Sequence, residues 1–136
     1  MESDGVKELA KYRFEKALAN IEIANVLYES ASYEVALNRA YYAAFDAIRA
    51  VNALDGFDSS KHSGVIAHFN QAYVKTQIFP ASTSSVIRKA SMLREKSDYE
   101  DFYEANKEET SETIARVEVF LKDVENFLRN KAVIGI

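Results

Sequence analysis

The sequence contains no cysteine and has only four glycines and one proline. The absence of cysteine excludes disulfide frameworks, thiolate zinc sites and cysteine nucleophiles. It is also compatible with a cytoplasmic protein, which is the location that we expect. Because the glycines and the proline fall mostly at the ends of periodic segments, the chain favours long helices joined by short connections.

Long apolar runs and an excess of positive charge are also missing. No apolar stretch approaches the roughly 20 residues that a membrane span requires, and the charged first residues are unlike a secretory signal, so we expect no membrane association. With 17 basic and 21 acidic residues the net charge is −4, which argues against a broad electrostatic grip on nucleic acid but not against a local basic patch. The length of 136 residues predicts one domain, residues 1–136, with a sizeable core.

Apolar residues recur at helical spacing along most of the chain, and no segment alternates with the period of two that is typical of a strand. The expected helices cover residues 4 to about 30, about 33 to 54, about 61 to 75, 82 or 83 to an interruption at Ser97 and Asp98, and about 107 to 130. The short joint at residues 30–32 predicts that the first two helices are antiparallel neighbours. We therefore predict an all-α, up-and-down bundle of four or five helices.

The segment from Ser32 to Gly56 is expected to form the central helix, because it carries two apolar stripes and a narrow polar one. The large apolar stripe contains Leu37, Tyr41, Ala44, Ile48 and Val51, and the small one contains Ala36, Ala40, Ala43, Ala47 and Ala50. The polar stripe contains Arg39, Tyr42, Asp46 and Arg49. Two interpretations of the polar stripe stay open. It forms either an Asp46–Arg49 ion pair beside a tyrosine whose hydroxyl is exposed to solvent, or a recognition site in which Arg39 binds phosphate.

The two histidines do not form a recognisable metal motif. His62 and His68 are six residues apart, which does not place them on one helical face, and neither follows a glutamate by three residues as in ferritin-like sites. The chain also lacks a phosphate-binding glycine loop and a basic DNA-reading helix. We expect neither a metal nor a cofactor.

Four motifs together resemble one known family. They are SASYEVALN, RAYYAAFDA, SSKHSGVIAHF and LREKSDYEDF, and the similarity covers roughly residues 5 to 130. The chain resembles the HEPN domain (higher eukaryotes and prokaryotes nucleotide-binding), in particular its small stand-alone bacterial and archaeal proteins. The resemblance implies a four- or five-helix bundle that dimerises and a metal-independent ribonuclease, often the toxin of a toxin–antitoxin pair. It also implies a small nucleotidyltransferase as the antitoxin partner.

In active members of that family an arginine is followed, after four to six residues, by a histidine, and two subunits bring these pairs together. Arg39 matches the arginine, whereas Asp46 stands where the histidine would fall. A carboxylate with a pKa near 4 is a weak base at pH 7, and it repels phosphate. A tyrosine that the partner enzyme modifies in some members corresponds to Ile48, so that regulation is not expected here.

Other residues could contribute to the site that the resemblance implies. His62 could supply the missing imidazole, or it could only cap a helix or tether a loop. His68 would lie nearer the level of Asp46 if the third helix ran antiparallel to the central one. Arg94, Asp98 and Tyr99 match an Arg–Asp–Tyr stretch of the family, and we expect an ion pair and a buried ring that fix the turn, with a place in the site as the alternative.

Taken together, these observations predict a homodimer in which the central helix forms the dimer interface and presents Arg39, Tyr42 and Asp46 beside a cleft. The expected ligand is RNA or a nucleotide. Two alternatives remain: a catalytically inactive module that docks a nucleotidyltransferase or another protein, and a purely structural dimer.

Overall fold

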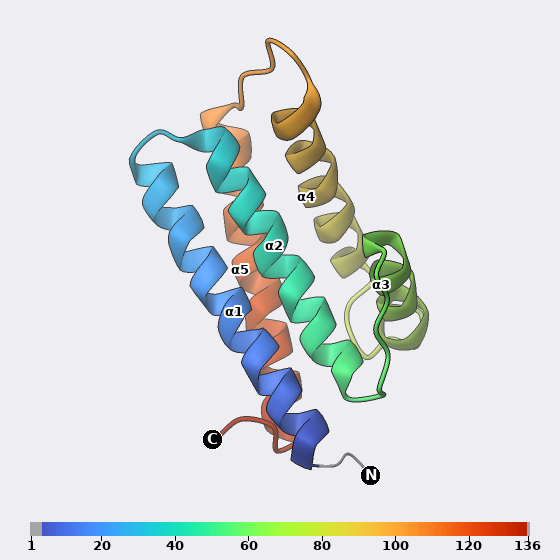
Figure 1. Ribbon diagram of the computed structural model, residues 1–136. Helices are drawn as coiled ribbons and strands as arrows, with labels where there is room; N and C mark the ends of the chain where they lie inside the picture. The colour runs from blue at the N-terminus through green and yellow to red at the C-terminus, as the bar shows by residue number, and fades with distance from the viewer. Residues whose placement is uncertain (1–3, 136) are drawn as a thin grey trace.

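The computed structural model describes residues 4–135 and consists of helices and their connections. The elements are α1 (Asp4–Glu29), α2 (Tyr33–Ala53), α3 (His62–Phe69), the π-helical turn η1 (Asn70–Val74), α4 (Ser82–Tyr99) and α5 (Lys107–Asn130). The described residues contain no strand. The long helices α1, α2, α4 and α5 run alternately up and down, and the short α3 lies at one side (Figure 1). The structure therefore confirms the predicted all-α bundle.

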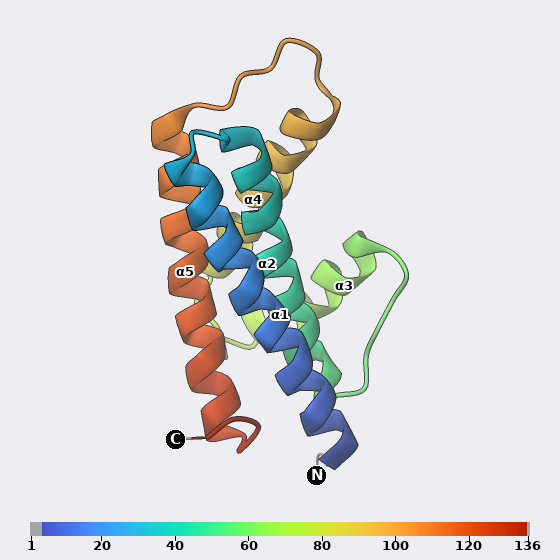
Figure 2. The same cartoon turned by 60° about the vertical axis from the view of Figure 1, so that its left-hand side comes forward.

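Helix α2 is the centre of the bundle, because it packs against α1, α3, α4 and α5. All ten residues of its two predicted apolar stripes are buried. In Figure 2, α1 and α5 cover one side of α2, and α3 stands on the other. The chain itself therefore covers both apolar stripes of α2. The homodimer interface expected along this helix stays a prediction.

The ends of α2 and α4 show where the sequence patterns succeeded and where they failed. Gly56, at φ 74°, ends the α2 segment in the left-handed conformation that glycine tolerates, as its position predicted. Helix α4, in contrast, is not interrupted at Ser97 and Asp98, but continues to Tyr99. The Asp98 carboxylate accepts hydrogen bonds from Arg94 and Asn38, so it does not compete with the backbone for helix bonds.

Helix α3 runs in the same general direction as α2, not antiparallel to it. Its first residue, His62, contacts Tyr41 in the middle of α2, whereas His68 near its end contacts Asp55 just beyond α2. His62, not His68, therefore lies near the middle of α2. The segment predicted as one helix over 61–75 also changes to a π-helical turn at Asn70.

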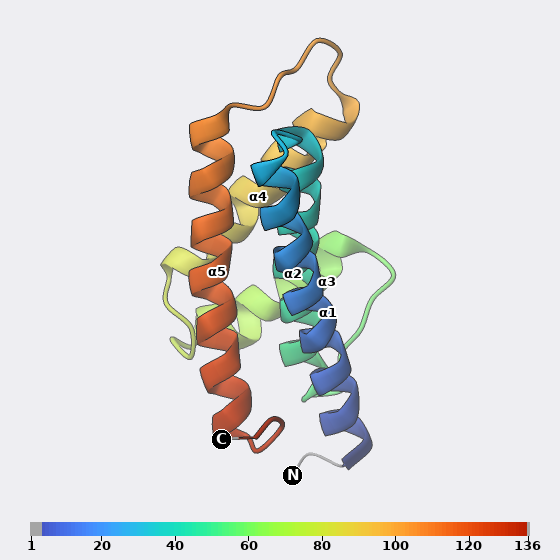
Figure 3. The same cartoon turned by 90° about the vertical axis from the view of Figure 1, so that its left-hand side faces the viewer.

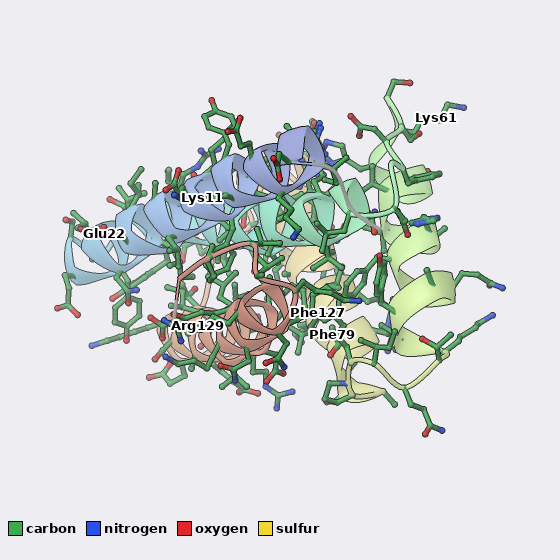
Figure 4. All side chains as sticks on the ribbon, turned by 90° about the horizontal axis from the view of Figure 1, so that it is seen from below. Lys11, Glu22, Lys61, Phe79, Phe127 and Arg129 are labelled. Carbon is green, nitrogen blue, oxygen red and sulfur yellow. The ribbon has the colours of Figure 1, made fainter. Side chains whose placement is uncertain are left out.

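A cluster of aromatic rings joins α3 and η1 to α5. Phe69 is fully buried, and its ring centroid lies 5.3 Å from that of Phe79 and 5.8 Å from that of Phe120. Phe79 also meets Phe127 at 5.4 Å, and these two rings lie next to each other in Figure 4. In Figure 3, α1 begins and α5 ends at the same end of the bundle, while α4 and α5 join at the other. The aromatic contacts thus fix the short α3 against the long helices.

Candidate functional site

Four side chains from three helices come together beside the middle of α2. They are Arg39 and Tyr42 of α2, His62 of α3 and Arg94 of α4, and we refer to them as the Arg–Tyr–His cluster. Both guanidinium groups lie over the Tyr42 ring, with the Cζ atoms of Arg39 and Arg94 at 5.2 and 5.8 Å from its centroid. The His62 ring meets the same tyrosine edge-on at 5.8 Å. The cluster thus joins two fixed cations, an aromatic ring and an imidazole.

Hydrogen bonds through two asparagines hold the arginines of the cluster. Arg39 donates from Nη1 to Asn20 Oδ1 at 3.0 Å, and from Nε and Nη2 to Asn38 Oδ1 at 3.0 and 2.7 Å. Asn38 in turn donates to Asp98 Oδ2 at 3.3 Å, and Arg94 donates to the same oxygen at 3.4 Å. This network fixes the relative positions of α2 and α4, and it confirms the predicted Arg94–Asp98 ion pair.

His62 is held against α2 by two contacts. Its ring stacks on Phe45 at a centroid distance of 4.1 Å, and its Nδ1 shares a hydrogen bond of 2.9 Å with the Tyr41 hydroxyl. Burial, together with the nearby charges of Arg94 and Arg49, lowers the pKa of His62 below its ordinary value of 6.5. The imidazole is therefore neutral near pH 7 and can accept a proton.

The lowered pKa of His62 predicts a pH dependence of stability. The unfolded chain takes up a proton at this histidine near pH 6.5, before the folded chain does, so the group destabilises the fold as the pH falls below about 6.5. We expect urea midpoints between pH 7.5 and 5.5 to fall more steeply for the wild type than for His62→Asn. A difference between the two proteins that does not vary with pH would contradict this prediction.

Asp46 does not belong to the cluster, although the sequence placed it on the same stripe. It is only 7% exposed, faces α1, and accepts a hydrogen bond of 2.9 Å from Asn20 Nδ2. Burial raises its pKa above the ordinary value of 3.8, against the opposing charge of Lys16 and the hydrogen bond from Asn20. The proposed Asp46–Arg49 pair is wrong, because the Arg49 guanidinium binds Asp58 at 3.0 Å.

The remaining candidates lie outside the cluster. Arg49 shares Asp58 with Arg13 and so ties α1 and α2 to the loop before α3. His68 stacks on Phe57 at 3.9 Å and binds Asp55 at 2.9 Å. Tyr99, which we expected to be a buried ring, is 76% exposed because it is the last residue of α4, where the chain turns into an exposed loop.

A groove of about 580 Å³ opens beside the cluster, between α3 and η1 on one side and α4 on the other. Two residues of the cluster, His62 and Arg94, line this groove, and so does Tyr41, whose hydroxyl is hydrogen bonded to His62. Sequence patterns missed this groove and the Phe45–His62 stack. The only available signal was the short KHSG segment, whose position in space depends on the loop before α3.

Two further properties concern the described residues as a whole. Within residues 4–135, no three Asp, Glu or His side chains gather as a set of metal ligands. In the same range no helix combines the length and the apolar character that a membrane crossing needs.

Comparison with known proteins agrees with the fold. The family model for the HEPN domain matches residues 10–127. The chain is 30% identical over 128 residues to "Putative toxin MJ0142" of Methanocaldococcus jannaschii, with 94% of this chain and 86% of that protein covered. It is 28% identical over 124 residues to a "UPF0332 protein" of Thermotoga maritima, with 91% and 94% covered. Because the family model spans most of the helical bundle, this chain belongs to the HEPN domain family.

Proposed function

We propose that this protein is the toxin-like member of a two-protein pair and that its Arg–Tyr–His cluster acts on RNA. The observation that carries the proposal is the convergence of Arg39, Tyr42, His62 and Arg94 from three helices. Two relatives have the word toxin in their names, which supports the biological setting. The partner in such a pair would be a small nucleotidyltransferase, as the family resemblance implies.

The cluster offers the groups that RNA cleavage without a metal requires. Arg39 and Arg94 can bind a phosphate through guanidinium hydrogen bonds and stabilise the charge that develops on it. His62 can take the proton from a ribose 2′-hydroxyl, whose oxygen attacks phosphorus while the bond to the 5′-oxygen breaks. The leaving oxygen takes a proton from water, and the products are a 2′,3′-cyclic phosphate and a 5′-hydroxyl.

The hydrogen bond between Tyr41 and His62 suits this role of the imidazole. Burial raises the pKa of Tyr41 to about 12, so its hydroxyl stays neutral at pH 7. A neutral hydroxyl can accept the proton of Nδ1, which leaves the other ring nitrogen, Nε2, unprotonated and able to act as a base. Tyr41 is then a positioning residue that acts through His62.

A second function, a binding module without catalytic activity, is supported by Asp46. The family places a histidine where this chain has a buried carboxylate that is hydrogen bonded to Asn20. A protein without the family's Arg–His pair could still bind RNA with its arginines, or dock a nucleotidyltransferase. Cleavage of RNA separates the two functions, because only the first includes it.

Replacement of Arg39 by alanine tests the proposed binding. We expect Arg39→Ala to weaken the affinity for a fluorescently labelled single-stranded RNA by about 10- to 150-fold, because a hydrogen bond to a charged group contributes about 1.5–3 kcal/mol. Fluorescence anisotropy would measure the affinity, and gel analysis of the same samples would report cleavage.

The matched control is Arg116→Ala, which removes an exposed arginine of α5 that pairs with Glu112 and lies outside the cluster. We expect this variant to bind RNA as the wild type does. Binding without cleavage by the wild type would favour the inactive module. Equal affinity of the wild type and Arg39→Ala for RNA would rule out the proposed RNA site.

A further inference from the structure

We infer that the groove between α3 and α4 is a nucleoside subsite, which holds the base and sugar next to the phosphate bound at the Arg–Tyr–His cluster. This inference rests on the proposed RNA function and names the part of the substrate that the groove takes. The groove and the cluster are continuous, because His62 and Arg94 belong to both. A phosphate at the two arginines therefore leaves its attached nucleoside at the mouth of the groove.

The size of the groove fits one nucleoside. Its volume of about 580 Å³ lies within the range of about 300–1,000 Å³ that is typical of small-molecule sites. The cavity has the short helix α3 as one wall and the long helix α4 as the other. Tyr41 of α2 also lines it and contacts His62 and Arg94 of the cluster.

The lining combines apolar surface with neutral hydrogen-bonding groups. Ile66, Ala67, Ile87 and Met92 provide surface against which a flat ring can pack. The hydroxyls of Ser63, Ser84 and Ser91 and the amide of Asn70 can meet the polar edge of a base. The Ser84 hydroxyl donates to Asn70 Oδ1 at 2.9 Å, which leaves the Asn70 Nδ2 hydrogens for a ligand.

These groups fit a heteroaromatic base better than they fit an alkyl chain or a second phosphate. An alkyl chain would leave the Asn70 Nδ2 hydrogens without a partner at a cost in free energy. Charged groups of both signs line the groove, namely Arg88, Arg94 and Glu95, and a second phosphate would leave the apolar lining residues without a partner. A base both covers the apolar residues and bonds to the neutral polar groups, as in proteins that bind single-stranded RNA.

A comparison of ligands with and without a base tests the subsite. Calorimetry would compare adenosine 5′-monophosphate and uridine 5′-monophosphate with ribose 5-phosphate. We expect at least one nucleotide to bind about tenfold or more tightly than the sugar phosphate, as a single packed base commonly gives. The variant Ala67→Trp, at an exposed position that lines the groove, should abolish this advantage and leave ribose 5-phosphate binding unchanged.

The control is Ala115→Trp, at an exposed position of α5 outside the groove, which should bind all three compounds as the wild type does. Equal affinity for nucleotide and sugar phosphate, or no effect of Ala67→Trp, would overturn the subsite. If ribose 5-phosphate still bound in an Arg39-dependent manner, the proposed RNA function would stand without the nucleoside subsite. Binding of none of the three compounds would count against both.

Discussion

Replacing His62 by asparagine is expected to lower the rate of RNA cleavage by about 10²- to 10⁴-fold, because the variant loses the group proposed to accept the 2′-hydroxyl proton. Asparagine can place a polar atom near the position of Nδ1 and so keep a hydrogen bond to Tyr41, which holds the ring in the native protein. The affinity for RNA should change little, since both arginines remain. Single-turnover cleavage of a labelled RNA would separate the rate from binding.

The other histidine of the chain provides the matched control. His68 is stacked on Phe57 and bound to Asp55, and it does not line the groove. His68→Asn should therefore cleave RNA at the rate of the wild type. A second readout is the pH profile of the rate, whose acid limb should follow the titration of His62 and disappear in His62→Asn. Cleavage by His62→Asn at the rate of the wild type would rule out this histidine as the base.

The architecture could be predicted from the sequence because it depends on residues within one helix. The four-three spacing of apolar residues on α2 identifies its two buried stripes. Gly56 likewise marks the end of α2 through local chemistry, because glycine tolerates the positive φ that the chain adopts there. Such signals do not require knowledge of what lies across the bundle.

The site could be predicted only in part, because its geometry depends on contacts between helices. Arg39 and Asp46 share one stripe, yet Asn20 of α1 binds both, and Asp46 is turned into the helix interface. Arg49 is paired with Asp58, a loop residue that helical spacing cannot place. His62 reaches Phe45 only because the loop after α2 returns the chain to the middle of that helix. Each of these partners is set by tertiary packing, not by local sequence.

Removal of the Phe69 ring is expected to produce the largest loss of stability. The side chain is fully buried and contacts Tyr73, Phe79 and Phe120, so truncation leaves a cavity between α3 and α5. We expect Phe69→Ala to lower the free energy of unfolding by about 3–5 kcal/mol, the usual cost of such a change in a core. Urea denaturation monitored by circular dichroism would measure it.

The same substitution should also weaken the candidate site, because Phe69 anchors the helix that carries His62. A loosened α3 would displace the imidazole from Phe45 and open one wall of the groove, so RNA cleavage should fall under conditions in which Phe69→Ala is still folded. The control is Phe102→Ala, since that ring is fully exposed and its loss should change stability by no more than about 0.5 kcal/mol. A loss in Phe69→Ala as small as in this control would show that the aromatic cluster does not hold α3 in place.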